Sequence, residues 1–87
     1  MEKVTVKVTK ADIRNGHAGS IMYCPIAKAA ARAFGEREDD GYVTVGSEDL
    51  TVGYTRHPLP ERARDFVRAF DNFAPVKPFQ FTIKLLD

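Results

Sequence analysis

The chain holds a single cysteine and no long run of apolar residues. One cysteine has no partner for an internal disulfide, so the cysteine content gives no indication of secretion. The N-terminal stretch MEKVTVKVTK alternates polar and apolar side chains and lacks the continuous apolar segment of a signal peptide. No stretch approaches the ~20 apolar residues that a membrane-spanning helix needs. These absences favour a cytoplasmic protein with no membrane partner.

The chain also lacks an excess of charge of one sign. It has 13 basic and 12 acidic residues, which give a net charge of +1. A protein that holds a phosphate backbone by charge alone is typically far more basic. The sequence contains no GxSxG, no HExxH, no P-loop and no carboxylate pair with the spacing of an acid and a base. We therefore predict that the protein is not an enzyme and uses no cofactor.

Metal-binding side chains are few and scattered. Structural zinc usually takes four Cys or His ligands, commonly in close pairs, whereas this chain offers only His17, Cys24 and His57. The acidic run within 36–40 lacks the spacing and the terminal glutamate of a calcium loop. We predict no metal site and interpret the acidic run as a solvated turn.

Alternation of apolar and polar residues predicts strands at 3–9 and 79–87. Two further strands are predicted at 42–45 and 50–54, and the short glycine-containing sequence between them predicts a hairpin. The prolines of RHPLP, 56–60, break the pattern and predict a loop. The apolar face of the last strand is expected to consist of Phe79, Phe81, Ile83 and Leu85.

Three helices are expected. Thr9 and Asp12 have the spacing of a capping box, and Asn15-Gly16 ends the short helix that they begin. Pro25 and Gly35 mark the start and end of an alanine-rich helix. A third helix is predicted over 60–73, with an apolar stripe formed by Leu59, Ala63, Phe66, Val67, Phe70 and Phe73.

This order of elements predicts a single α+β domain over 1–87. It matches the two-layer, ferredoxin-like β-α-β-β-α-β arrangement, in which one antiparallel sheet carries its helices on one face. Another α+β sheet with the same elements connected differently is the alternative.

Two surfaces are candidates for binding. The open face of the predicted sheet is polar and slightly basic, with few aromatic residues, and it suits a protein partner or, as the alternative, nucleic acid. Edge strands of the sheet would also allow a homodimer. The second candidate is the set of loops around His17, Arg56 and His57. The residues of the sheet face are Lys3, Thr5, Lys7, Gln80, Thr82 and Lys84.

The segment before the alanine-rich helix offers two further hypotheses. Backbone N–H groups of Gly16, Gly19 and Ser20 could hold an anion, although a flexible connector is the simpler interpretation. Cys24 lies at the start of a helix, where the dipole favours a thiolate and hence a thiol-dependent enzyme. A buried structural cysteine is the competing interpretation, which we favour.

The stretches DIRNGHAGSIMYCPIAKA and PLPERARDFVRAFDNFAPVKPFQFTI cover much of the chain. They resemble small uncharacterised proteins of bacteriophages and prophages, in which a D-I-x-x-G-x-x-G segment precedes a C-P-[IV]-A helix. The resemblance implies phage origin, location in the host cytoplasm and action on a host or phage macromolecule, and it transfers no catalytic residue. Our leading hypothesis is a non-enzymatic interaction module that binds a partner protein and inhibits a host function such as defence.

Overall fold

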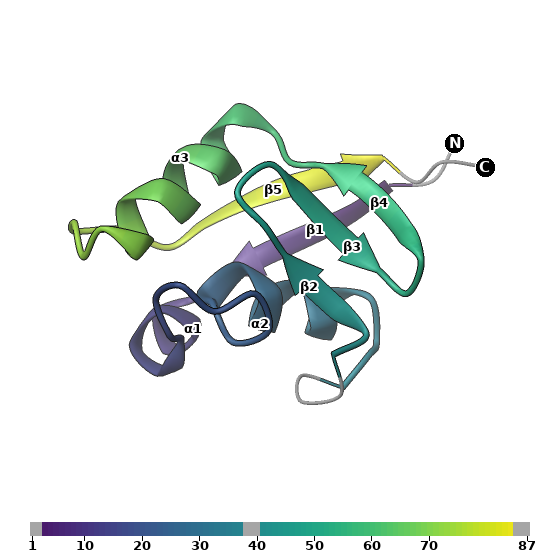
Figure 1. Cartoon of the computed structure of the whole chain (residues 1–87), viewed down its shortest axis with the longest axis horizontal. Helices are drawn as coiled ribbons and strands as arrows, with labels where there is room; N and C mark the ends of the chain where they lie inside the picture. Colours follow the sequence, from purple (N-terminus) through teal and green to yellow (C-terminus); the bar gives the residue numbers. More distant parts are fainter. Residues whose placement is uncertain (1–2, 38–40, 85–87) are drawn as a thin grey trace.

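Two antiparallel sheets and three helices make up the fold (Figure 1). The structure is a computed structural model, and it describes residues 3–37 and 41–84. Within these ranges no helix is long and apolar enough to cross a membrane. In chain order the elements are β1 (Lys3–Val8), α1 (Lys10–Asn15), α2 (Pro25–Ala33), β2 (Val43–Val45), β3 (Asp49–Val52), β4 (Thr55–Pro58), α3 (Glu61–Asp71) and β5 (Phe79–Lys84).

The first and last strands pair with each other, as their alternating sequences allow. β1 runs antiparallel to β5 along its whole length, and every second residue of each strand is buried or half-buried. The predicted inward and outward faces of both strands are therefore confirmed for the described residues, whereas Leu85 and residues 38–40 of the acidic run lie outside them. The buried residues of this sheet are Val6, Val8, Phe81 and Ile83.

The predicted ferredoxin-like sheet is wrong, although the α+β class is confirmed. β2, β3 and β4 form a separate sheet, in which β3 pairs with both neighbours. One error lies at residues 56–58, which belong to β4 although the sequence predicted a loop over 56–60. Gly53 has a φ of +62°, which suits the first central position of a two-residue hairpin turn, and the chain folds back as β4. Pro58 is tolerated because it ends an outer strand.

The alanine-rich helix α2 lies between the two sheets and contacts both β1 and β2 (Figure 1). Pro25 is its first residue and Gly35 lies just past its end, as predicted. Ile26 and Ala30 are buried on one side of the helix, and Ala27 and Ala31 on other sides are buried as well. Small side chains let the backbone approach neighbours on more than one side, so α2 is the centre of the core.

Helix α3 is shorter than its sequence pattern predicts. Ala63, Phe66 and Val67 are buried as expected, and the helix ends at Asp71. Phe73 lies beyond that end and is 87% exposed, so its predicted place in the apolar stripe is wrong. The pattern failed because helical periodicity applies only where the backbone is still helical.

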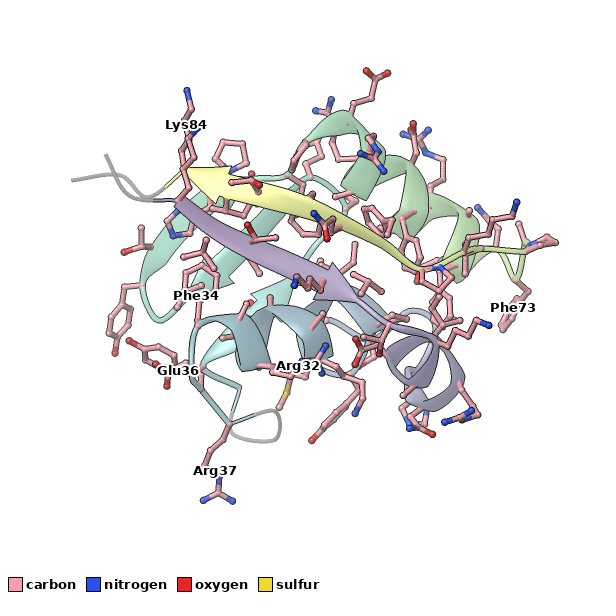
Figure 2. The ribbon with its side chains drawn as sticks, turned by 180° about the vertical axis from the view of Figure 1, so that it is seen from behind. Arg32, Phe34, Glu36, Arg37, Phe73 and Lys84 are labelled. Atoms are coloured by element: carbon pink, nitrogen blue, oxygen red, sulfur yellow. The ribbon has the colours of Figure 1, made fainter. Side chains whose placement is uncertain are left out.

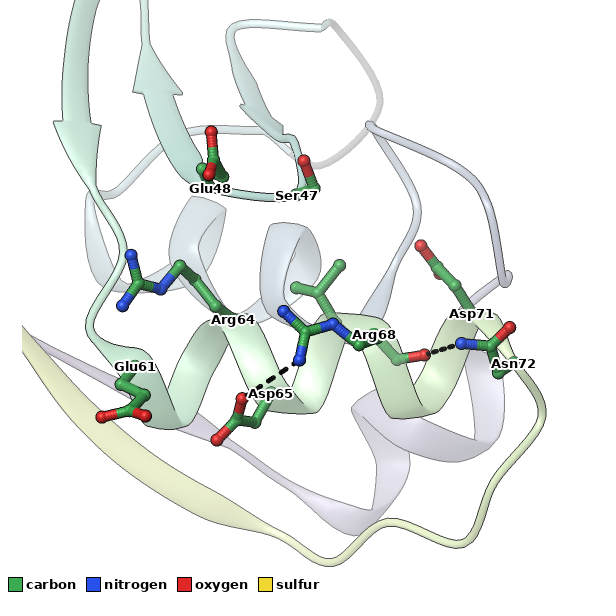
Figure 3. Close-up of a pocket in the computed structure, with 9 residues that line it drawn as sticks. Ser47, Glu48, Glu61, Arg64, Asp65, Arg68, Asp71 and Asn72 are labelled. Atoms are coloured by element: carbon green, nitrogen blue, oxygen red, sulfur yellow. Dashed lines mark hydrogen bonds and ion pairs between the residues drawn. The ribbon is translucent and has the colours of Figure 1, made fainter.

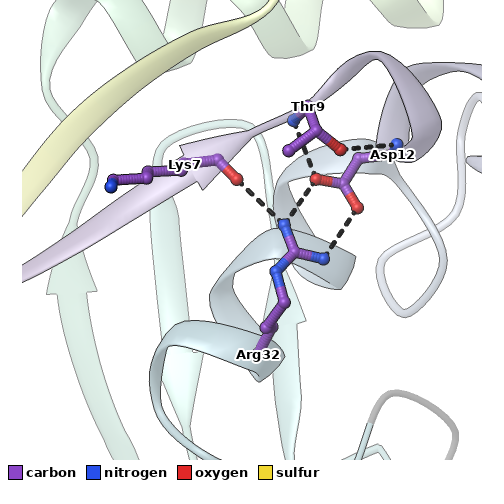
Figure 4. Close-up of polar contacts among 4 residues, drawn as sticks. All are labelled: Lys7, Thr9, Asp12 and Arg32. Carbon is purple, nitrogen blue, oxygen red and sulfur yellow. Dashed lines mark hydrogen bonds and ion pairs between the residues drawn. The ribbon is translucent and has the colours of Figure 1, made fainter.

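Asp12 joins three elements through its buried carboxylate (Figure 4). The Thr9 N–H donates to one of its oxygens at 2.9 Å, and the Asp12 N–H donates to the Thr9 hydroxyl at 3.2 Å, which confirms the capping box. Arg32 of α2 donates to both carboxylate oxygens, at 3.1 and 2.8 Å. The same guanidinium donates to the Lys7 carbonyl of β1 at 3.0 Å. One ion pair thus fixes α1 against α2 and β1.

Gly16 lets α1 end close to the start of α2. Its N–H donates to the Asp12 carbonyl at 2.8 Å. A Cβ at this position would lie 2.7 Å from the Pro25 ring and 2.8 Å from the Asp12 carbonyl oxygen. Glycine is therefore required here by space, because neither the ring nor the backbone carbonyl can move away at small cost.

Replacing Asp12 by Asn is expected to lower the free energy of unfolding by about 1–3 kcal/mol, because it removes the charge that Arg32 pairs with. Urea unfolding followed by circular dichroism measures the change. The matched control is Asp65→Asn on α3, which breaks an exposed pair with Arg68 at 3.6 Å and should cost less than about 0.5 kcal/mol. Equal losses in the two variants would show that the Asp12 pair does not stabilise the fold.

The same carboxylate predicts a pH dependence of stability. Burial alone raises the pKa of Asp12, but the hydrogen bonds from Arg32 and Thr9 outweigh burial and hold the pKa below its ordinary value of 3.8. The ionised Asp12 carboxylate therefore contributes its full share to the free energy of unfolding above the unfolded-state pKa. This contribution is lost as the pH falls through the folded-state pKa. Below pH 3.8 the wild type should lose stability more steeply than Asp12→Asn, and parallel curves would contradict this.

Candidate functional site

The exposed face of the β1–β5 sheet gathers the lysines that the sequence predicted there. Lys3 lies directly opposite Lys84, and Lys7 lies opposite Gln80. All of these side chains are exposed, and among the described residues no carboxylate forms an ion pair with the three lysines. Like charges directly opposite on a sheet destabilise it. We call this surface the lysine face, formed by Lys3, Thr5, Lys7, Gln80, Thr82 and Lys84.

The predicted anion-binding loop uses its polar groups within the chain. The Gly19 N–H donates to a carboxylate oxygen of Asp71 at 2.9 Å, and the Gly16 N–H is bound to the Asp12 carbonyl. The Ser20 hydroxyl accepts the N–H of Tyr23 at 3.0 Å. Asp71 of α3 thus takes the place that an external anion would need at Gly19, which argues against a ligand there.

The loop set around His17, Arg56 and His57 is not a single surface. His17 is exposed and lies edge-on to Tyr23, with ring centroids 6.3 Å apart. Arg56 is exposed on β4, 4.0 Å from the Asp49 carboxylate. His57 is the neighbouring residue on β4, so it faces the core and is only 4% exposed. The prediction that it lies at an exposed turn is wrong.

His57 is also a buried polar side chain without full pairing. Its ring stacks on Phe34 with centroids 6.2 Å apart, and its Nδ1 atom has no hydrogen-bond partner among the described residues. An unpaired buried nitrogen costs free energy. His57 lines neither of the two grooves described below.

Cys24 is a structural residue at the N-terminus of α2. It is 5% exposed, and its sulfur accepts the Ala27 N–H at 3.4 Å as the helix cap. Burial raises the pKa of the thiol above its ordinary value, and the hydrogen bonds at the helix terminus lower it by less. The thiol therefore stays protonated near neutral pH, which argues against a nucleophile.

The groove of Figure 3 lies between α3 and the turn before β3, and it has a volume of about 480 Å³. Charges of both signs line it, and Arg68 pairs with Asp65 at 3.6 Å. Among the described residues no group of three or more His, Cys, Asp or Glu side chains could hold a metal. The polar lining residues are Ser47, Glu48, Glu61, Arg64, Asp65, Arg68, Asp71 and Asn72.

A second groove, of about 410 Å³, lies between α1 and the chain that follows α3. None of its lining side chains carries a charge or a hydrogen-bonding group, and its volume is within the ~300–1,000 Å³ of ligand-binding clefts. Ile13, Phe70 and Val76 are half-buried and pack against the core beneath it. We call it the apolar groove, lined by Ile13, Gly16, Ala18, Phe70, Phe73, Ala74, Pro75 and Val76.

Phe73 stands at the edge of the apolar groove and projects from one end of the molecule, whereas Lys84 lies at the other end (Figure 2). Its φ is +59°, the only positive value outside glycine among the described residues. Its N–H donates to the Phe70 carbonyl at 3.0 Å, and the Ala74 N–H donates to the Ala69 carbonyl at 2.9 Å. These two bonds form a Schellman motif, in which glycine is the usual residue at the position of Phe73.

Phe73 was missed as a surface residue because it continues the helical stripe by spacing. The sequence nevertheless carries a stop signal, since Asp71-Asn72 are turn-forming residues and Pro75 follows closely. This stop signal places the helix end before Phe73, so Phe73 need not follow the apolar stripe into the core.

Comparison of the chain with known proteins found no match. No protein-family model matches the chain, and neither a curated protein nor a solved structure matches it.

The burial of Cys24 predicts that its thiol reacts slowly in the folded protein. A thiol-specific reagent at pH 7.5 is expected to react with the folded protein roughly 100-fold more slowly than with the urea-unfolded chain, because the sulfur is covered and protonated. Absorbance of the released reagent group measures both rates. Rapid reaction in the folded protein would revive the thiol-enzyme hypothesis.

Proposed function

We propose that this protein is a non-catalytic module that binds a segment of a partner protein in the apolar groove, with Phe73 as the anchor. The observation that carries this proposal is that Phe73 is unfavourable in two ways. Its side chain exposes an aromatic ring to water, and its backbone takes a conformation that costs L residues about 1–2 kcal/mol relative to the right-handed region.

Nothing within the described fold compensates for that cost. The ring is 87% exposed, so it adds little to the core, and the two hydrogen bonds of the Schellman motif come from the backbone and need no side chain. A glycine at this position would satisfy the helix end at least as well. Strained residues of this kind concentrate at functional sites, and exposed aromatic residues beside grooves are typical anchors of protein interfaces.

The apolar groove supplies the complementary part of such an interface. An apolar side chain from a partner would contact Phe70 and Val76 on the floor and Phe73 on the wall. If the chain is of phage origin, as its resemblance implies, the partner is a host or phage protein, and inhibition of a host function is one consequence of binding.

Nucleic-acid binding on the lysine face is the second candidate. The lysines have no ion-pair partner within residues 3–37 and 41–84, and Lys3 repels Lys84 across the strands. Both observations favour this candidate, because phosphate groups would relieve that repulsion. The face carries no aromatic side chain on which a base could stack, and three lysines give a weak phosphate contact. The protein-binding proposal is therefore the stronger of the two.

The test replaces Phe73 by Gly and measures binding and stability together. Peptides are selected from a random display library on the immobilised wild-type protein and synthesised. Phe73→Gly is expected to weaken their binding at least ~10-fold, as loss of an aromatic anchor does. It is expected to raise the free energy of unfolding by about 0.5–1 kcal/mol, because glycine adopts the positive φ without strain.

Tyr54 provides the matched control, because it is a fully exposed aromatic residue on the β3–β4 turn, outside the apolar groove. Tyr54→Ser should leave peptide binding unchanged. Phe73→Asn is the second variant, since asparagine also tolerates a positive φ but is less flexible than glycine. A selection without specific binders, or binders that Phe73→Gly leaves unaffected, would contradict the proposed function.

A further inference from the structure

The charged residues around the apolar groove are mostly basic and unpaired. Lys10 and Arg14 lie one turn apart on α1, on either side of Ile13 in the sequence, and Lys77 follows Val76. All three are exposed, and none has an ion-pair partner among the described residues. The elements that form the groove therefore carry three cations that nothing in the described fold neutralises.

The acidic residues of the same elements are already engaged. Asp12 is 3% exposed, and its carboxylate is bound to Arg32 and to the Thr9 N–H. Asp71 accepts the N–H of Gly19. The side chains that line the groove are apolar, and the exposed charged residues on α1 and directly after Val76 are cations.

From this arrangement we infer that the partner segment is an acidic amphipathic peptide. The inference rests on the proposed function and adds the chemical class of the partner. Its apolar side chains would fill the groove beside Phe70 and Phe73, and its Asp or Glu side chains would pair with Lys10, Arg14 and Lys77. Charges at the rim of an interface select between partners and speed association, so they decide which apolar segment binds.

A peptide is favoured over an anionic lipid surface because the binding region is concave. Membrane-surface binding uses a broad apolar face that enters the headgroup layer, with many cations on its flank. Here the side chains of Ile13, Phe70 and Val76 line the groove and are half-buried, and the exposed part of its lining includes Phe73, Ala74 and Pro75. A groove of this form fits a narrow segment with apolar anchors at helical spacing.

The experiment compares three synthetic peptides of about 15 residues that share one set of apolar residues at helical spacing. The remaining positions are mainly Glu in the first peptide, Gln in the second and Lys in the third. Fluorescence anisotropy measures each affinity at low and at physiological ionic strength. The Glu peptide should bind at least ~10-fold more tightly than the Lys peptide, and its advantage should shrink as salt is added.

Variants of the protein locate the effect. Lys10→Gln, Arg14→Gln and Lys77→Gln, combined in one protein, should remove most of the preference for the Glu peptide while Phe73-dependent binding of the Gln peptide is kept. The control combines Lys3→Gln and Lys84→Gln on the lysine face, at the other end of the molecule from Phe73 (Figure 2). It should leave the preference unchanged, and thermal melts establish that both variants are folded.

The outcomes separate the two proposals. Equal, Phe73-dependent binding of all three peptides would overturn the acidic partner and leave the proposed function in place. Binding of none, or binding that Phe73→Gly does not weaken, would overturn the proposed function itself. A last measurement uses vesicles with anionic headgroups. Tight Phe73-dependent binding to these vesicles, without binding to the Glu peptide, would contradict a peptide partner and favour a lipid surface.

Discussion

The ion pair between Asp12 and Arg32 is the constraint on which the rest of the structure depends. Helix α1 has six residues, too few to be stable alone. Its cap at Thr9 begins the helix, and Arg32 ties the same carboxylate to α2 and to the β1 backbone. Without this ion pair, α1 would be held mainly by the packing of Ile13 against the core, and the part of the apolar groove that contains Ile13 would be less firmly positioned.

Helix α2 connects the two sheets, because it packs against a strand of each. Its alanines bring β1 close on one side and β2 on another, so a single helix serves as the common core of both sheets. Cys24 and Pro25 belong to this packed start, and Gly16 lets the preceding chain pass close to them. The sequence suggested a reactive thiol and an anion-binding loop in this segment. In the structure, Cys24 caps α2 and Gly16 fits closely against Pro25, so both contribute to the packing that places α1 beside α2.

Local rules predicted much of this fold. The capping box at Thr9, the proline at the start of α2 and the alternating faces of β1 and β5 follow from short-range chemistry, and all are confirmed. The pairing of strands depends on contacts distant in sequence, so the separate second sheet did not follow from periodicity, and His57 was placed at the surface in consequence. The lysine face could be predicted from alternation, whereas the apolar groove required the tertiary approach of α1 to the end of α3.

The central claim is that a partner segment occupies the apolar groove beside Phe73. Backbone amide chemical shifts of the ¹⁵N-labelled protein, recorded while a selected peptide is added, test it most directly because they report every surface at once. The account predicts that the largest shifts fall within residues 13–18 and 70–77, the two segments that contain the residues lining the groove. Largest shifts on the lysine face of β1 and β5, or on the β3–β4 turn, would contradict it.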